Sequence, residues 1–259
     1  MLLAVYRRRE RPVTQNSQDS QVLSYGDHPD QHLTLVHSRV QPSRGTAVLV
    51  HGGYWRQRIN AAVMQPMLED LLQAGWNVAN VEYRRGPEHP WPTPSVDVAL
   101  AIELIRSTLR REDRPDRLVL IGHSVGGQLV LLNADRADAV VGLAPVTNAI
   151  KVFEEDLGDS AAKEYFERTP SDAPTTYRQA SPCHQPSPAV PMLLVHGQDD
   201  DRVPLEHTRQ YIQSLGDKAQ QTAMFHPHLD HFEAIDPKKH HWDAVRNWMT
   251  RASADAQAE

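Results

Sequence analysis

The sequence predicts an α/β protein with a mostly parallel central sheet flanked by helices, because short apolar runs alternate with longer segments of helical periodicity. Near-continuous apolar strands are typical of a parallel sheet that is buried on both faces. The expected strands are 46–50, 78–81, 118–121, 140–143 and 192–195. The length of 259 residues allows one large domain. We assign residues 21–259 to it and expect residues 1–20 to be a flexible N-terminal lead-in.

Helices are expected between these strands. After Pro94, apolar residues recur on one face of a predicted helix: Val96, Leu100, Leu104 and Ile105. Further helices are expected at 124–132, at 205–215 and around Trp242, Val245 and Trp248, whose shared face should pack on the sheet. The segment 146–189 contains five prolines and interrupts the alternation. It is expected to lie over the sheet as a short cap.

Composition narrows the classes of partner. Lys and Arg number 27 against 33 Asp and Glu, a formal charge of −6, so no global basic field attracts nucleic acid or anionic lipid. The single cysteine, Cys183, forms no internal disulfide, which fits a reducing compartment. No apolar run is long enough to cross a membrane, and the N-terminus reverses the order of a secretory signal. We expect a cytoplasmic protein that binds neither nucleic acid nor membrane; a homodimer is compatible with the sequence.

The strongest local motif is Gly-His-Ser-Val-Gly at 122–126, which follows a predicted strand and precedes a predicted helix. Such a strand-to-helix turn is so tight that its flanking positions require small side chains, and it projects the serine hydroxyl at the carboxyl end of the sheet. This context predicts a nucleophilic Ser124. The alternative is a serine that only caps the helix.

A second motif, His-Gly-Gly-Tyr-Trp at 51–55, follows the strand 46–50. Its consecutive glycines free backbone N–H groups, and those of Gly52 or Gly53, together with that of Val125, are predicted to bind the oxyanion of acyl transfer. The alternative is a plain turn with core aromatic residues. Aromatic residues expected at the crevice as substrate contacts are Tyr54, Trp55 and Trp91.

The acid and base of a catalytic triad are expected later in the chain than these two motifs. Three aspartates, Asp199, Asp200 and Asp201, follow the strand 192–195. Like charges at adjacent positions cannot all point into one crevice, and by spacing we favour Asp200, with Asp199 next. The base is expected to be one of three later histidines, His226, His228 or His231. The order Ser, Asp, His is that of serine hydrolases built on a parallel sheet.

From about Tyr25 to the last helix, the chain resembles the α/β-hydrolase superfamily. Its HGGYW stretch, G-H-S-x-G and late D-H-F are similar to those of arylformamidases (kynurenine formamidases) and small bacterial esterases. This resemblance implies Ser124 as nucleophile, Asp200 as acid and His231 as base. It also implies an oxyanion hole formed by Gly52, Gly53 and Val125.

The function predicted from these features is a serine hydrolase that cleaves a small ester or amide through an acyl-enzyme. An aryl formamide such as N-formylkynurenine is the candidate amide, and no metal, nucleotide or redox cofactor is required. One alternative is a carboxylesterase acting on short acyl esters. A second is a zinc hydrolase using the run His226-x-His228-x-Asp230-His231. A third is a binding module of this fold without catalysis.

Overall fold

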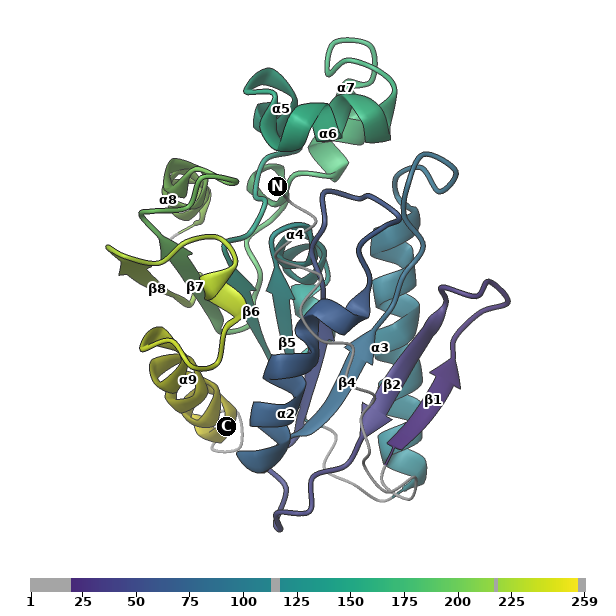
Figure 1. Ribbon diagram of the computed structural model, residues 1–259, viewed down its shortest axis with the longest axis vertical. Coiled ribbons are helices and arrows are strands. Elements are labelled where there is room, and N and C mark those ends of the chain that lie inside the picture. Colours follow the sequence, from purple (N-terminus) through teal and green to yellow (C-terminus); the bar gives the residue numbers. More distant parts are fainter. Residues whose placement is uncertain (1–19, 113–116, 217–218, 256–259) are drawn as a thin grey trace.

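The computed structural model describes residues 20–112, 117–216 and 219–255, and its centre is an eight-stranded sheet (Figure 1). The strands are β1 (Ser20–Ser24), β2 (His32–Val36), β3 (Thr46–Val50), β4 (Asn77–Val81), β5 (Leu118–His123), β6 (Ala139–Leu143), β7 (Met192–Gly197) and β8 (Gln221–His226). Their order across the sheet is β1-β2-β4-β3-β5-β6-β7-β8. Strands β1 and β2 run antiparallel to their neighbours, and every other pair is parallel. The predicted mostly parallel sheet is confirmed.

Three strands were not expected from the sequence. Strands β1 and β8 lie at the edges of the sheet and are largely exposed, and β2 lies beside β1. Their sequences mix polar and apolar residues, so they lack the continuous apolar runs that mark strands β3 to β7. Ser20, assigned to the lead-in, begins β1. The rest of the predicted lead-in, residues 1–19, lies outside the described residues.

Helices cover both faces of the sheet. Their bounds are α2 (Gln65–Gln73), α3 (Thr93–Arg111), α4 (Val125–Leu132), α8 (Leu205–Ser214) and α9 (His241–Asp255), with short 3₁₀ helices η1 (Ala61–Met64), η2 (Ala134–Arg136) and η4 (Glu233–Ile235). Helices α3, α4 and α8 share one hydrophobic core, whereas α2 and α9 share the core on the opposite face. Figure 1 shows α2 and α9 in front of the sheet and α3 behind it. In the described part of the chain, none of the helices combines the length and the apolar character that crossing a membrane needs.

Two predicted helix faces have different outcomes. The face of α9 that carries Trp242, Val245 and Trp248 packs into the core, as predicted. The predicted face of α3 is wrong at Val96 and Leu100, which are 46% and 37% exposed, whereas Ile105 is buried as predicted. The buried face of α3 is formed by residues such as Val98, Ala101, Ile102, Ile105 and Leu109. The prediction followed the largest aliphatic residues, whereas small Ala101 marks the face that fits against the sheet.

A group of short helices lies between β6 and β7, within the segment 146–189. It comprises α5 (Ala149–Glu154), α6 (Leu157–Phe166), α7 (Pro174–Gln179) and η3 (Pro182–His184). Figure 1 places α5, α6 and α7 together at the top of the molecule, beyond the carboxyl ends of the parallel strands. The start of α6 carries a run of positive φ angles at Gly158, Asp159 and Ser160. A Cβ on Gly158 would lie 2.6 Å from the Tyr54 ring, so this glycine lets the cap approach the loop after β3.

Candidate active site

Ser124 occupies a strained turn between β5 and α4. Its backbone has φ 57° and ψ −118°, outside the regions that most residues adopt, and its side chain makes no capping hydrogen bond to the helix. The turn depends on its glycines, because a Cβ on Gly122 would lie 2.1 Å from the Gly126 carbonyl oxygen. A Cβ on Gly126 would lie 2.0 Å from the Val50 carbonyl oxygen. The geometry is therefore that of a serine displayed by a sharp turn, rather than that of a helix cap.

The loop after β3 passes directly beside this serine. A Cβ on Gly52 would lie 2.8 Å from the Ser124 Cβ, and Gly53 has φ +130° and lines the same pocket as Ser124. Val125 is the first residue of α4, so its N–H has no carbonyl acceptor within the helix. The structure thus brings Gly52, Gly53 and Val125, the three predicted oxyanion residues, together around Ser124.

A buried ion cluster holds the beginning of this loop. The His51 ring lies 2.7 Å (Nδ1) from the Gly52 carbonyl oxygen and 3.0 Å (Nε2) from Glu82 Oε1. The Arg85 guanidinium also donates to Glu82. Burial alone would raise the pKa of Glu82, but the hydrogen bond and charge of His51, with the charge of Arg85, lower it to about 2. A charged Glu82 therefore fixes His51, and His51 in turn orients the peptide of Gly52.

The structure separates the three aspartates that follow β7. Asp200 Oδ2 accepts a 2.7 Å hydrogen bond from His231 Nδ1, and its Oδ1 accepts two backbone N–H groups. Asp199 and Asp201 point outward, with side chains 60% and 74% exposed. Burial alone would raise the pKa of Asp200, yet hydrogen bonds from His196 and His231 outweigh burial and hold the pKa below its usual value. Asp200 is the carboxylate that remains ionised against His231.

Two histidines that the sequence analysis did not single out complete this arrangement. His196 Nε2 lies 3.1 Å from Asp200 Oδ2, and its Nδ1 lies 2.7 Å from Thr208 Oγ1. His123 Nε2 lies 2.8 Å from the His231 carbonyl oxygen, and burial lowers the pKa of His123 to about 3. His123 is therefore neutral and donates to the backbone of His231. Each histidine lies in the last two residues of a buried strand, and that position is the sequence signal by which both could have been found.

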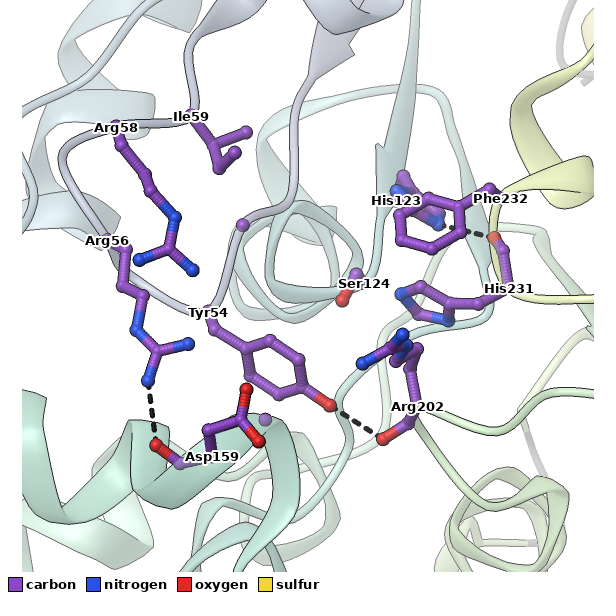
Figure 2. A pocket seen from close by; sticks show the side chains of 12 residues that line it. Tyr54, Arg56, Arg58, Ile59, His123, Ser124, Asp159, Arg202, His231 and Phe232 are labelled. Atoms are coloured by element: carbon purple, nitrogen blue, oxygen red, sulfur yellow. Dashed lines mark hydrogen bonds between the residues drawn. The ribbon is translucent and has the colours of Figure 1, made fainter. Parts of the chain in front are cut away.

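Ser124 and His231 line one pocket at the carboxyl end of the sheet, and Figure 2 shows the His231 ring turned toward the serine side chain. Tyr54 lies across the pocket, and its hydroxyl donates a 2.6 Å hydrogen bond to the Arg202 carbonyl oxygen. Phe232 adds a second aromatic wall. The predicted nucleophile and the two predicted triad partners are thus held at one site.

Two of the three predicted aromatic contacts are corrected. Trp55 is 1% exposed, stacks on Tyr165 at 5.3 Å between ring centroids, and donates through Nε1 to Gln128. Tyr54 and Trp55 both have positive φ angles, and their side chains diverge: Tyr54 lines the pocket and Trp55 packs in the core. Trp91 lines a separate groove beside Asn133 and does not reach the pocket of Ser124.

The run from His226 to His231 does not converge on one point. His226 Nδ1 lies 3.2 Å from His240 Nε2, whereas His228 is largely exposed and lies 3.6 Å from Asp199. Asp230 accepts two backbone N–H groups of its own turn, and His231 bonds to Asp200. Among the described residues, no three His, Cys, Asp or Glu side chains are grouped so as to hold a metal ion. The spacing that suggested a zinc site therefore has no matching geometry.

The fold and the serine turn define the class: this is a protein of the α/β-hydrolase superfamily, as the sequence resemblance implied. Residues 36–215 match the model of the BD-FAE family, and the chain belongs to that family. Esterase LipC of Mycobacterium tuberculosis is 27% identical over 220 residues, which cover 74% of this chain and 53% of LipC. Esterase LipQ of the same organism is 25% identical over 265 residues, which cover 92% of this chain and 60% of LipQ. The chain thus spans about half the length of the first of these relatives and three-fifths of the second.

Solved structures agree on the fold. A truncated carbohydrate esterase from gut microbiota superimposes with a TM-score of 0.77 at 18% identity, covering 91% of this chain and 96% of that one. An inhibited Esterase B from Lactobacillus rhamnosis gives 0.76 at 18% identity, covering 94% and 90%. At this identity the likeness concerns the backbone arrangement, so the chemistry must be argued from the residues of the site.

Proposed function

We propose that the protein is a serine hydrolase that cleaves small carboxylic esters through an acyl-enzyme on Ser124. One observation carries this proposal: the 2.7 Å bond between Asp200 and His231 holds the imidazole in the pocket that Ser124 lines. The similarity to LipC and LipQ, both named as esterases, supports an ester as the substrate class.

In the first half of the reaction, the Ser124 oxygen attacks the ester carbonyl while His231 takes the hydroxyl proton. Because Nδ1 of His231 is bonded to Asp200, the free acceptor is Nε2. Asp200 stabilises the imidazolium that forms. The backbone N–H groups of Gly53 and Val125, with Gly52 as the alternative first donor, receive the oxyanion; one such donor lowers the barrier by about 3–4 kcal/mol.

The first half ends when the tetrahedral intermediate collapses and His231 gives its proton to the leaving alcohol. The acyl group stays on the Ser124 oxygen. Water then attacks the acyl-enzyme, giving its proton to His231, and collapse of the second intermediate releases the acid and regenerates the serine hydroxyl. Every proton in this cycle is carried by His231, so the scheme requires only the residues of this chain and water.

An aryl formamide is the second candidate substrate, because the pocket presents two aromatic walls, Tyr54 and Phe232. Flat aromatic side chains suit a planar aryl group such as that of N-formylkynurenine. The same proton transfers would release an amine in place of an alcohol. The relative kcat/KM of the two substrate classes decides between them.

The test measures kcat/KM for p-nitrophenyl acetate, p-nitrophenyl butyrate and N-formylkynurenine with the purified chain and its Ser124→Ala variant. We expect turnover of the esters by the unmodified protein and loss of that turnover in a variant whose circular dichroism is unchanged. Faster cleavage of N-formylkynurenine than of either ester would assign the formamide. Full ester turnover by the variant, or no turnover of any of the three by the folded parent, would refute the proposal.

A further inference from the structure

Three arginine side chains line the pocket of Ser124: Arg56, Arg58 and Arg202. The pocket contains a single carboxylate beyond the triad among the described residues, that of the exposed Asp159. This excess of positive charge stands out because the whole chain has a formal charge of −6. Figure 2 shows Arg56 and Arg58 on the Tyr54 side of the pocket, and Arg202 beside His231.

Two of these arginines already have acidic neighbours. The Arg56 Nε donates to Glu164 at 2.7 Å, and its Nη2 donates to the Asp159 carbonyl oxygen at 2.8 Å. Arg202 Nε lies 3.2 Å from Asp201, a carboxylate that is 74% exposed and therefore well screened. The two hydrogen bonds of Arg56 hold its guanidinium in place, whereas Arg202 Nε is buried without a hydrogen-bond partner among the described residues. Both arginines therefore keep unused N–H groups.

Arg58 differs from both. Arg58 is an exposed residue, and within the described residues its guanidinium has neither a hydrogen-bond acceptor nor a carboxylate partner, although Figure 2 shows it directed into the pocket. Ile59 and the Tyr54 ring supply apolar lining of the same pocket. An unpaired guanidinium above such a surface is a ready site for an anion, since its planar fork binds a carboxylate through two parallel hydrogen bonds.

We infer that the substrate carries a second, anionic group, a carboxylate, and that Arg58 binds it while Ser124 attacks the ester of the same molecule. This inference rests on the proposed hydrolase function and names its substrate class: half-esters, or esters of a carboxylated alcohol. Glu164 and Asp201 largely balance the charges of Arg56 and Arg202, so the positive field that attracts such anions comes mainly from Arg58 and acts most strongly at low salt. Asp159 opposes that field.

The carboxylate can lie on the acyl side or on the alcohol side of the ester, and two matched pairs of substrates distinguish these cases. On the acyl side, p-nitrophenyl hydrogen adipate is compared with p-nitrophenyl hexanoate, which share a leaving group. On the alcohol side, 4-acetoxybenzoate is compared with its methyl ester. For each pair the measured quantity is the ratio of kcat/KM for the anionic substrate to that for the neutral one, in the parent and in each variant.

Three variants test the assignment. Arg58→Gln should lower the ratio at least about tenfold in one of the two pairs, because it removes the charge and the paired hydrogen bonds of the guanidinium, while neutral esters are still cleaved. Asp159→Asn should raise the same ratio, because it removes the opposing charge, and asparagine tolerates the φ of 55° found there. Arg136→Gln is the control, since this arginine is exposed and paired with Glu103 away from the pocket. It should leave both ratios unchanged.

The pair that responds to Arg58→Gln identifies the side of the ester that carries the carboxylate. Ratios that stay the same in Arg58→Gln for both pairs, in a protein that cleaves the neutral esters, would overturn this inference and leave the hydrolase function standing. A protein that cleaves none of the four esters would overturn both. Addition of 0.5 M NaCl, on the order of the ionic strength that screens charges beyond a few ångströms, should weaken the preference for the anion in the parent chain.

Discussion

A single oxygen of Asp200 lies between two imidazoles: Oδ2 is 3.1 Å from His196 Nε2 and 2.7 Å from His231 Nδ1. Its other oxygen, Oδ1, accepts the backbone N–H groups of Arg202 and Val203. The carboxylate thus has four donor groups around it, two imidazoles and two backbone N–H groups. Because His196 is itself bonded to Thr208 on the following helix α8, the orientation of the proposed triad acid is fixed by the fold as well as by its own loop.

Replacement of Asp200 distinguishes the three adjacent aspartates. Asp200→Asn should lower kcat by about 10³- to 10⁴-fold, because the amide would favour the wrong tautomer of His231 and would not stabilise the imidazolium. Asp199→Asn and Asp201→Asn are matched controls, since both side chains point into solvent. Steady-state kinetics on p-nitrophenyl butyrate measure all three. A loss of the same size in either control would remove Asp200 from the role of acid.

His196 is expected to act as a positioning residue. His196→Ala removes one donor from Asp200 and leaves Thr208 and the Val203 carbonyl without their ring partner. We expect kcat to fall about tenfold with KM little changed, and the free energy of unfolding to fall by about 2 kcal/mol. His196→Gln, whose amide can still donate, should recover part of kcat. A rise in KM without a fall in kcat would show that His196 acts on the shape of the pocket and not through Asp200.

His123 makes stability depend on pH. The folded protein lowers the pKa of His123 from 6.5 to about 3, so below pH 6.5 the unfolded chain binds a proton that the folded chain does not. The stability that a neutral His123 contributes is therefore complete above pH 6.5 and is lost as the pH falls. Between pH 7 and pH 5 the parent should lose about 2 kcal/mol more than His123→Gln.

Urea unfolding at the two pH values measures this difference. His228→Gln is the control, because the imidazole of His228 is 88% exposed. It should retain the pH dependence of the parent. Identical pH dependence in the parent and in His123→Gln would show that His123 is protonated at pH 5 in the folded state.

Tyr54 and Trp55 should have separable effects. Trp55→Phe leaves the side chain of Gln128 without its indole donor in a buried site and removes ring volume, so we expect a loss of about 2–3 kcal/mol in stability. Its KM for small esters should stay close to that of the parent. Tyr54→Phe removes the bond to the Arg202 carbonyl oxygen at the pocket and should change KM with little loss of stability. A changed KM in Trp55→Phe, together with an unchanged KM in Tyr54→Phe, would show that Trp55 contacts the substrate.

The parts of the site that could be predicted are those whose geometry is local. Ser124 lies in a turn where a Cβ on Gly122 would meet the carbonyl oxygen of Gly126, so residues close to it in sequence define its conformation. The choice of Asp200 among three aspartates depends on how the loop after β7 folds back onto His231. Spacing favoured Asp200, and the fold gives the reason, since two backbone N–H groups turn this carboxylate inward.

What the sequence could not show depends on side-chain direction and on distant packing. Tyr54 and Trp55 both have positive φ angles, which neither residue type favours, so the sequence does not indicate that one side chain enters the pocket and the other the core. The pairing of His123 with the His231 carbonyl joins residues 108 positions apart. Side-chain size is no guide to the buried face of α3, because Val96 and Leu100 are exposed whereas the small Ala101 is buried.

Reaction with a fluorophosphonate probe, followed by peptide mass mapping, tests the central claim most directly. Such a probe forms a covalent bond only with a serine whose hydroxyl is activated by a neighbouring base and whose oxyanion is stabilised. We expect one labelled residue, Ser124, and loss of labelling in Ser124→Ala and in His231→Gln. A correctly folded protein that is not labelled at Ser124, or that is labelled there equally well without His231, would contradict it.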